Sequence, residues 1–234
     1  MLFKKITNNI QELGVIEGTL YCLGVFLEKI SLGRIRLIRY LFVAQPIPAT
    51  STTHLRPSPK SQIGLTEPNS PFVKAFPRPA EVIEKRFQDG NICIAASNEG
   101  QFTGYIWIAH GHYDEDEIRC RYQLAEPDRC VWDFDVYVEP AHRLGRCLAR
   151  LWDFTNNHLS QSGKHWSFSR IAASNVESIR SHRRLGIQPL FSASFLCIGT
   201  SQVMLSTHRP FFHVSLSSSR IPTLSFDTPS SDSK

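Results

Sequence analysis

Residues 132–138 alternate between apolar and polar side chains, which is the pattern of a strand with two unlike faces. One face carries Trp132, Phe134, Val136 and Val138, and the other carries Asp133, Asp135 and Tyr137. Pro140 has no N–H to donate to a ladder, so we expect the strand to end just before it. Two carboxylates on a covered face are costly without partners. They indicate either a functional site or ion pairs with arginines such as Arg121 or Arg170.

The segment after this strand predicts a basic turn that leads into a helix. The turn contains Arg143, Leu144, Gly145 and Arg146, and the apolar positions of the helix are Leu148, Leu151, Trp152 and Leu159. Unpaired N–H groups and the helix dipole favour an anion at a helix N-terminus, and the two arginines add positive charge. The turn therefore predicts binding of a phosphorylated ligand.

The rest of the chain predicts strands and helices in a mixed order. Helices are expected within 5–31 and over 80–88, and strands over 34–44, 91–97, 101–110, 117–124, 189–198 and 202–207. We divide the chain into an N-terminal helix and strand extension (1–45), a Pro/Ser-rich linker or loop (46–78), a folded domain (79–214) and a disordered tail (215–234). The expected fold class is α/β (α+β), with a mixed, mostly antiparallel central sheet flanked by helices.

The order of these parts resembles the GNAT superfamily of acetyl-CoA-dependent acyltransferases. In that family a strand ending in V-x-V-x-P leads into an arginine- and glycine-rich turn, and here the strand end reads Val136-Tyr137-Val138-Glu139-Pro140. The family's second signature, N-x-x-[AS]-x-x-x-[Y]-x-x-x-G, is matched by Asn175, Ser178, His182 and Gly186. The resemblance covers the predicted domain, residues 79–214.

The resemblance implies that acetyl-CoA or another acyl-CoA binds and that its acyl group moves to an amine by direct attack. It assigns the pyrophosphate to Arg143, Leu144, Gly145 and Arg146, and the pantetheine arm to Val136, Tyr137 and Val138, on the edge of a sheet whose central strands splay apart. The family's loop has three small residues and this chain has one glycine, so arginine side chains would replace some backbone contacts.

The resemblance also implies roles in proton transfer. His182 stands where the family often has a tyrosine that protonates the leaving thiolate; the alternative is a histidine packed on its own helix beside Arg183 and Arg184. Asp135 is the preferred general base, with Asp133 as a second carboxylate. Two further residues keep two interpretations each: Asn175 contacts the ligand or caps its helix, and Ser178 touches the pantetheine or allows close packing.

Composition and charge narrow the classes of partner that the chain could bind. The chain of 234 residues has a formal charge of +5, with no nucleic-acid-binding motif and no dense Lys/Arg stripe, so we expect no nucleic acid partner. The expected partner is a small-molecule or protein amine acceptor, with an acyl carrier protein as a further option. The acidic cluster at 110–117 crowds one turn, which favours a solvated loop over a metal site.

The sequence also predicts a cell compartment and leaves a second candidate function open. Six scattered cysteines without a C-x-x-C pair, and no evident secretory signal, indicate a cytoplasmic protein with reduced thiols. The apolar segment 13–27 is shorter than the ~20 residues that span a bilayer, so membrane association through residues 1–31 is the less favoured alternative. The rival function is a non-catalytic GNAT-like module that binds a ligand or a partner.

Overall fold

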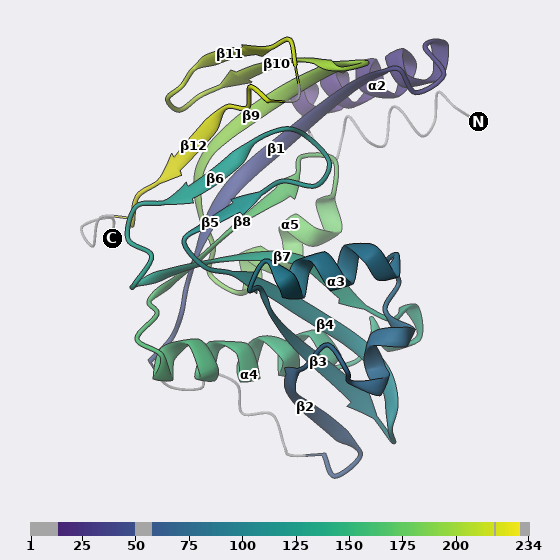
Figure 1. The fold of residues 1–234 in the computed structure, drawn as a ribbon, viewed down its shortest axis with the longest axis vertical. Coiled ribbons are helices and arrows are strands. Elements are labelled where there is room, and N and C mark those ends of the chain that lie inside the picture. The colour runs from purple at the N-terminus through teal and green to yellow at the C-terminus, as the bar shows by residue number, and fades with distance from the viewer. Residues whose placement is uncertain (1–13, 50–57, 218, 230–234) are drawn as a thin grey trace. The chain divides into compact units, whose positions relative to one another are not determined.

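The computed structural model describes residues 14–49, 58–217 and 219–229, and its elements fall into two compact units (Figure 1). Unit 1 is made of residues 1–45, 112–125 and 168–234, and unit 2 of residues 46–111 and 126–167. The fold class is α+β with a mixed, mostly antiparallel sheet flanked by helices, as the sequence predicted.

Unit 1 contains one large sheet and one small sheet. The large sheet has the strand order β11-β10-β9-β1-β8, and the small sheet has the order β12-β6-β5, in which β12 and β6 are parallel. The bounds are α2 Val15–Ile30, β1 Ile35–Pro46, β5 His112–Asp114, β6 Arg121–Leu124, β8 Trp166–Ala172, α5 Val176–Arg184, β9 Gln188–Ile198, β10 Ser201–Ser206, β11 Phe212–Ser215 and β12 Thr223–Phe226.

Strand β1 lies inside the large sheet of unit 1. It pairs antiparallel with β9 from Ile35 opposite Ile198 to Ala44 opposite Gln188. Tyr40 and Phe42 are fully buried. The N-terminal strand that we assigned to an extension therefore supplies core residues of unit 1.

The C-terminal segment corrects another expectation, because residues 223–226 form a buried strand where we predicted a disordered tail. Leu224 and Phe226 are buried, and the Phe226 ring packs against Phe42 and Phe191 with ring centroids 5.4 and 5.2 Å apart. Two alternating apolar residues are enough to hold this short strand in place, because it pairs with β6, which is already part of the small sheet.

Unit 2 is built on a four-stranded antiparallel sheet in the order β7-β4-β3-β2. Its bounds are β2 Ser61–Thr66, the short 3₁₀ segment η1 Pro71–Ala75, α3 Ala80–Gln88, β3 Ile92–Asn98, β4 Gln101–Ala109, β7 Cys130–Val138, the 3₁₀ turn η2 Pro140–His142 and α4 Cys147–Gln161. Helix α3 covers the face of β4 that carries Trp107, since Phe87 packs on that ring at 4.8 Å. Helix α4 covers the other face, where Leu151 meets Gly104 (Figure 1).

The predicted linker is partly folded. Strand β2 pairs with β3 along its length, and Phe76 is buried against Phe102 and Tyr105, with ring centroids 5.0 and 4.7 Å apart. Residues 50–57 of the predicted linker, and 1–13 of the predicted N-terminal extension, lie outside the described residues.

Candidate functional site

A β-bulge near the end of β7 shapes the candidate site in unit 2. Tyr105 of β4 lies opposite Tyr137, and Trp107 lies opposite Phe134, so Ile106 alone faces both Asp135 and Val136. Asp135 has φ +46°, in the left-handed region that non-glycine residues seldom adopt. Bulges bend a strand, leave backbone groups unpaired and redirect side chains, and they are frequent beside active sites.

The bulge overturns the predicted faces of β7. Asp135 bonds to the Tyr105 hydroxyl at 2.9 Å, and Tyr137 lies beside the Tyr105 ring at 5.6 Å, so both share the face of Phe134 and Trp107. Asp133 lies opposite Ile108 and belongs to the other face. The prediction that Asp133 and Asp135 share one face was wrong, because the extra residue reverses the alternation from Asp135 onward.

Asp135 joins two arginines and a tyrosine. Arg78 donates to it through Nε (2.9 Å) and Nη2 (2.5 Å), and Arg86 through Nη1 (2.6 Å). The Asp135 and Arg86 side chains are 9% and 8% exposed, and the Arg86 guanidinium also lies over the Trp107 and Phe134 rings at 5.4 and 5.1 Å. The ion-pair alternative thus holds for Asp135, with partners other than the arginines we named.

This network keeps Asp135 ionised. Burial raises the pKa of its carboxyl, and the hydrogen bonds and charges of Arg78 and Arg86 outweigh burial, so the net pKa is lowered. A general base at neutral pH works best with a pKa near the operating pH. The surroundings of Asp135 therefore argue against its predicted role as the base and favour a role in positioning the two arginines.

Asp133 is 2% exposed and accepts a hydrogen bond from Ser167 Oγ at 2.6 Å. A buried carboxylate of this kind gives the core of unit 2 a satisfied polar contact. Its burial separates it from any substrate, which argues against the role of second catalytic carboxylate.

The predicted phosphate turn lies between β7 and α4. Arg146 is the N-cap of α4 and provides no side-chain cap, so the first N–H groups of the helix keep no intrahelical partner. Arg143 donates its Nε to the carbonyl of Val138 at 3.0 Å, which ties the turn to the strand end. Leu144 and Arg146 are exposed, and a Cβ on Gly145 would lie 3.3 Å from the His142 carbonyl. The turn is thus tightly wound and presents two cations.

The second predicted signature lies on α5 in unit 1. The Asn175 side chain accepts from the Ser178 N–H at 3.0 Å, so the structure confirms the capping alternative for Asn175. His182 Nδ1 lies 2.8 Å from the Ser178 carbonyl and 3.3 Å from its hydroxyl. His182 is therefore held by its own helix through Nδ1, which is the contact that the alternative of a packed histidine predicts.

The acidic segment that we expected to be solvated is partly buried in unit 1. The Glu115 side chain is fully buried and receives two hydrogen bonds from Arg170, at 2.8 and 2.6 Å. The Arg170 guanidinium lies 4.3 Å from the centre of the Tyr40 ring, and the Tyr40 hydroxyl donates to Glu117. Burial raises the pKa of Tyr40, so this hydroxyl stays protonated. No local pattern could have found the cluster, since its members lie on separate segments.

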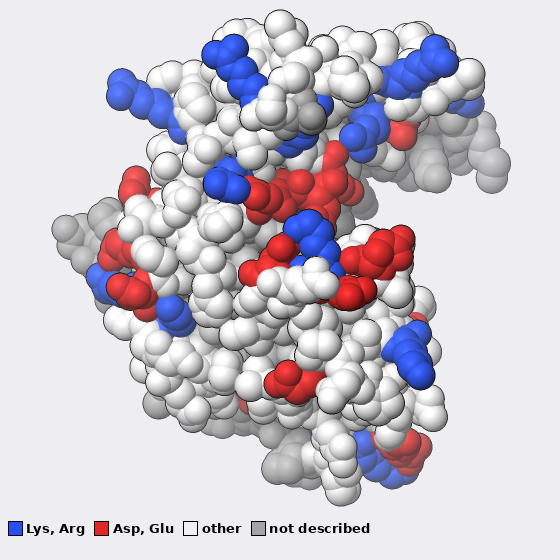
Figure 2. Space-filling view, in the orientation of Figure 1, with Lys and Arg blue, Asp and Glu red and all other residues white. Residues whose placement is uncertain are grey.

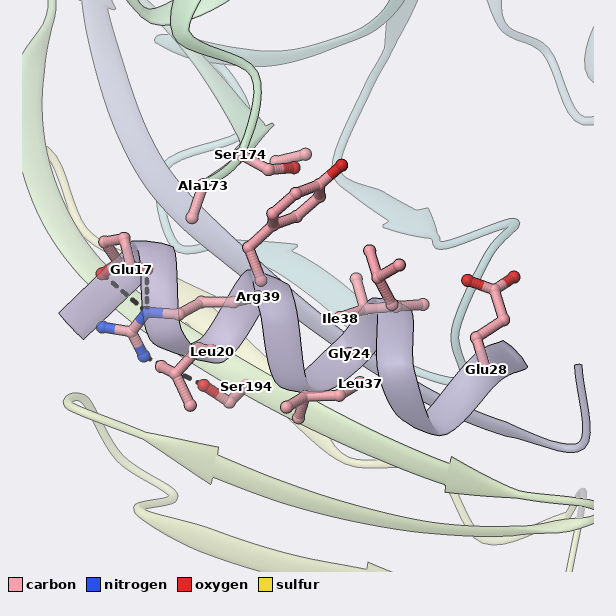
Figure 3. Close-up of a pocket in the computed structure, with 13 residues that line it drawn as sticks. Glu17, Leu20, Gly24, Glu28, Leu37, Ile38, Arg39, Ala173, Ser174 and Ser194 are labelled. Atoms are coloured by element: carbon pink, nitrogen blue, oxygen red, sulfur yellow. Dashed lines mark hydrogen bonds and ion pairs between the residues drawn. The ribbon is translucent and has the colours of Figure 1, made fainter. Parts of the chain in front are cut away.

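Figure 3 shows a groove in unit 1 between α2 and the large sheet. Arg39 crosses its floor and bonds to Glu17 of α2 at 2.7 and 2.8 Å, to Ser194 at 2.9 Å and to Ser192 at 3.1 Å. Gly24 lets the helix approach the sheet, because a Cβ there would lie 2.9 Å from the Leu37 carbonyl. The polar groups of this groove therefore fasten α2 to β1.

On the face drawn in Figure 2, Lys and Arg side chains are dispersed among white surface and acidic groups and form no continuous stripe. Among the described helices, none is long and apolar enough to cross a membrane.

No protein-family model matches the chain, and no curated protein is similar to it in sequence. Solved structures are similar in fold. A functionally unknown conserved protein from Staphylococcus epidermidis has a TM-score of 0.50 at 12% identity, over 75% of this chain and 67% of that one. A protein from Novosphingobium aromaticivorans assigned to the GNAT acetyltransferase family has a TM-score of 0.48 at 16% identity, over 68% of this chain and 63% of that one.

A third structure, yncA from Salmonella typhimurium with its cofactor acetyl-CoA, has a TM-score of 0.35 at 20% identity, over 57% of this chain and 80% of that one. This chain thus spans less than two thirds of the Novosphingobium protein's length. The solved structures to which this chain is similar thus include one assigned to the GNAT family, the Novosphingobium protein.

Proposed function

We propose that the chain is an acyltransferase that binds acetyl-CoA or another acyl-CoA and passes the acyl group to an amine by direct attack. One observation within unit 2 carries this proposal. A bulged strand end at Asp135–Val136 leads through η2 into an arginine-bearing turn at the uncapped N-terminus of α4.

The turn suits a pyrophosphate. Arg143 is anchored through Nε, and its two terminal nitrogens have no protein acceptor within the described part of the chain. Together with Arg146 and the first N–H groups of α4, they supply charge-assisted donors to an anion. Gly145 keeps the turn compact. Bulky Leu144 limits close backbone approach, so side-chain donors carry more of the binding than a glycine-rich loop would need.

The bulge suits an amide-bearing arm. Residues Asp135 and Val136 oppose a single residue of β4, so part of their backbone is left out of the ladder. A pantetheine arm carries amides that pair with such groups as a peptide strand does. In this proposal Val136, Tyr137 and Val138 hold the arm, while Asn175 and Ser178 act through the stability of α5.

Proton transfer is assigned to fewer residues than the sequence implied. The predicted acid His182 lies on α5 of unit 1 and is given no step within unit 2, so the leaving thiolate takes its proton from water. Asp135 acts as a positioning residue that holds Arg78 and Arg86. The attacking amine then loses its proton to water or to a group of the acceptor, because the carboxylates of both Asp133 and Asp135 are engaged by protein donors.

The engaged carboxylates favour a second candidate, a module that binds an acyl-CoA or a related ligand without turnover. In that case the turn and the bulge keep their binding roles, and no residue accepts a proton. The two candidates share the ligand and differ in whether the thioester is consumed.

Calorimetric titration with acetyl-CoA tests the binding. The double variant Arg143→Glu, Arg146→Glu is expected to bind at least about tenfold more weakly, since charge-assisted hydrogen bonds to the pyrophosphate are lost. Lys74→Glu is the control, because Lys74 is an exposed cation of unit 2 on η1 and does not belong to the turn. S-acetyl-pantetheine lacks the pyrophosphate and is expected to bind the wild type and the double variant equally.

Thiol release from acetyl-CoA with a panel of amines then separates the two candidates. Amine-dependent release supports the enzyme, and binding without release in any amine supports the module. If acetyl-CoA binds the double variant as tightly as the wild type, the turn has no phosphate-binding role and the proposal fails.

A further inference from the structure

A second pocket in unit 1 lies beside α5, where β9 runs past the end of β10. It has a volume of about 390 Å³, within the range of ligand sites. Its walls are mostly apolar and come from three strands and the helix, with Phe42, Ile171, Ile179, Leu190 and Phe191 among them. His208 stacks on Phe191 at 4.7 Å and supports that wall.

An irregularity in the sheet creates this space. Phe42 of β1 lies opposite Phe191, but the next residue, Val43, lies opposite Pro189, so Leu190 has no partner on β1. Pro189 cannot donate a hydrogen bond, which weakens the pairing at this end of the strand. The extra residue bends β9, and Ile179 and Arg183 of α5 contribute to the lining of the pocket.

The polar groups that line the pocket differ in whether other protein groups already occupy them. Thr207 Oγ1 accepts from the Ser192 N–H at 3.0 Å and lies 3.3 Å from the Ser192 carbonyl, and Ser192 Oγ accepts from Arg39. Arg183 of α5 also lines the pocket, and no acceptor for its guanidinium is present among residues 14–49, 58–217 and 219–229. The neighbouring groove in Figure 3 is the opposite case, since its Arg39 is fully occupied by Glu17 and two serines.

We infer that this pocket binds an apolar carboxylate, such as a medium-chain fatty acid, with the hydrocarbon chain among the apolar walls and the carboxylate paired with Arg183. An arginine fork binds a carboxylate through two parallel hydrogen bonds, which a hydroxyl or an amide cannot reproduce. The apolar walls exclude a small hydrophilic anion as the preferred ligand, because such an anion would bury no apolar surface there. The site lies within unit 1 and does not depend on the acyl-CoA site proposed in unit 2.

Titration calorimetry of the full chain with decanoate tests the inference, with decanol and acetate as comparison ligands. Decanoate is expected to bind, and Arg183→Gln is expected to weaken its affinity by about tenfold through loss of the charge-assisted pair. Arg184→Gln is the matched control, because Arg184 is the next cation on α5 and does not line the pocket. Decanol is expected to bind the wild type and Arg183→Gln equally, and acetate to bind neither.

A second variant, Ile179→Trp, fills the apolar part of the pocket and is expected to abolish binding of both ten-carbon ligands. Both substitutions are on a helix without buried residues, so the fold is expected to survive, and the urea midpoint of each variant checks this. The inference is overturned if decanoate fails to bind the wild type, if Arg183→Gln leaves its affinity unchanged, or if Arg184→Gln weakens it equally.

Discussion

Asp135 combines a left-handed backbone with a buried ion pair, and each feature depends on the other. The unfavourable backbone conformation costs of order 1–3 kcal/mol and persists only where surrounding contacts determine it. Here the determining contacts are Arg78, Arg86 and the Tyr105 hydroxyl. A single substitution at Asp135 therefore tests the whole network.

Asp135→Asn is expected to lower the free energy of unfolding by about 3 kcal/mol, because the nearly buried Arg86 loses its compensating charge. Urea denaturation measures this loss. Asp89→Asn is the control, since the Lys85–Asp89 pair is exposed and contributes less than about 1 kcal/mol. Equal effects of the two substitutions would show that the Asp135 network does not stabilise unit 2.

The same carboxylate predicts a pH dependence. Its pKa is lowered in the folded state, so its contribution is present above the unfolded pKa of about 4 and is lost as pH falls through the folded value. The difference in unfolding free energy between wild type and Asp135→Asn is therefore expected to be constant from neutral pH to about pH 5 and to shrink below about pH 4. Urea midpoints across this range check it, and a gap that widens in acid would contradict the ionised state.

Sequence reasoning found Asp135 but not its surroundings. Period-two alternation placed it on the face of Asp133, and a one-residue bulge without a glycine leaves no local signal to warn of the reversal. Its partners Arg78 and Arg86 are distant in sequence, and Arg86 is a buried cation on an otherwise ordinary helix. Asn175 was better determined, since a capping side chain and the N–H it accepts from are only three residues apart.

Among the elements, β4 and β7 approach each other so closely at Gly104 that no side chain fits. A Cβ there would lie 2.5 Å from the Tyr137 carbonyl and 3.2 Å from Leu151 of α4. Gly104→Ala is expected to destabilise the protein by about 1–3 kcal/mol, because backbone cannot move aside as a flexible side chain can. Thermal and urea unfolding measure the effect.

Gly64→Ala provides the comparison for Gly104→Ala. Gly64 is also a strand glycine of unit 2, on β2, but a Cβ there meets nothing within 4 Å. Its substitution is expected to be neutral or slightly stabilising, since alanine loses less backbone entropy on folding. Should Gly104→Ala prove equally neutral, β7 would be able to shift away from β4, and the tight bulged geometry would not be required.

The elements that the sequence predicted well are those with a clear period or a clear stop. Helix α3, strands β3 and β4 and their turn, and the β9–β10 hairpin lie close to the predicted ranges. Strands β2 and β12 were missed because each is short and lies in a Ser/Pro-rich segment, where composition indicates disorder. Their stability comes from β3 and β6, strands distant in sequence, so only tertiary pairing reveals them.

Substitution of Phe226 tests how much β12 contributes to the stability of unit 1. The ring is 1% exposed and packs against Phe42, Tyr122, Phe168 and Phe191. Phe226→Ala is expected to cost about 3–5 kcal/mol, whereas Ser225→Ala, on the exposed side of the same strand, is expected to change stability by less than about 0.5 kcal/mol. Urea unfolding followed by near-ultraviolet circular dichroism gives the unfolding free energy of both variants. If both substitutions change it by less than about 0.5 kcal/mol, β12 does not stabilise unit 1 and the prediction of a disordered tail is correct.

For the whole molecule, the chain path predicts which fragments fold. Both units are assembled from separate segments, and the fragment 79–214 that carries the GNAT-like motifs lacks β1, β2 and β12. Strand β1 pairs with β9 along most of its length and contributes Tyr40, Phe42 and Val43 to the core. Without it, β9 would expose a long apolar edge, which is prone to aggregation.

The fragment 79–214 is therefore expected to show no cooperative urea transition and no near-ultraviolet circular dichroism, because the large sheet of unit 1 lacks the interior strand β1. The fragment 14–229 keeps every described element and is expected to unfold with the midpoint of the full chain. A cooperative transition in fragment 79–214 would mean that the motif-bearing segment folds alone and that β1 is an addition to it. Acetyl-CoA titration of a folded fragment would then show directly whether binding at the turn Arg143–Arg146 needs β1, β2 or β12.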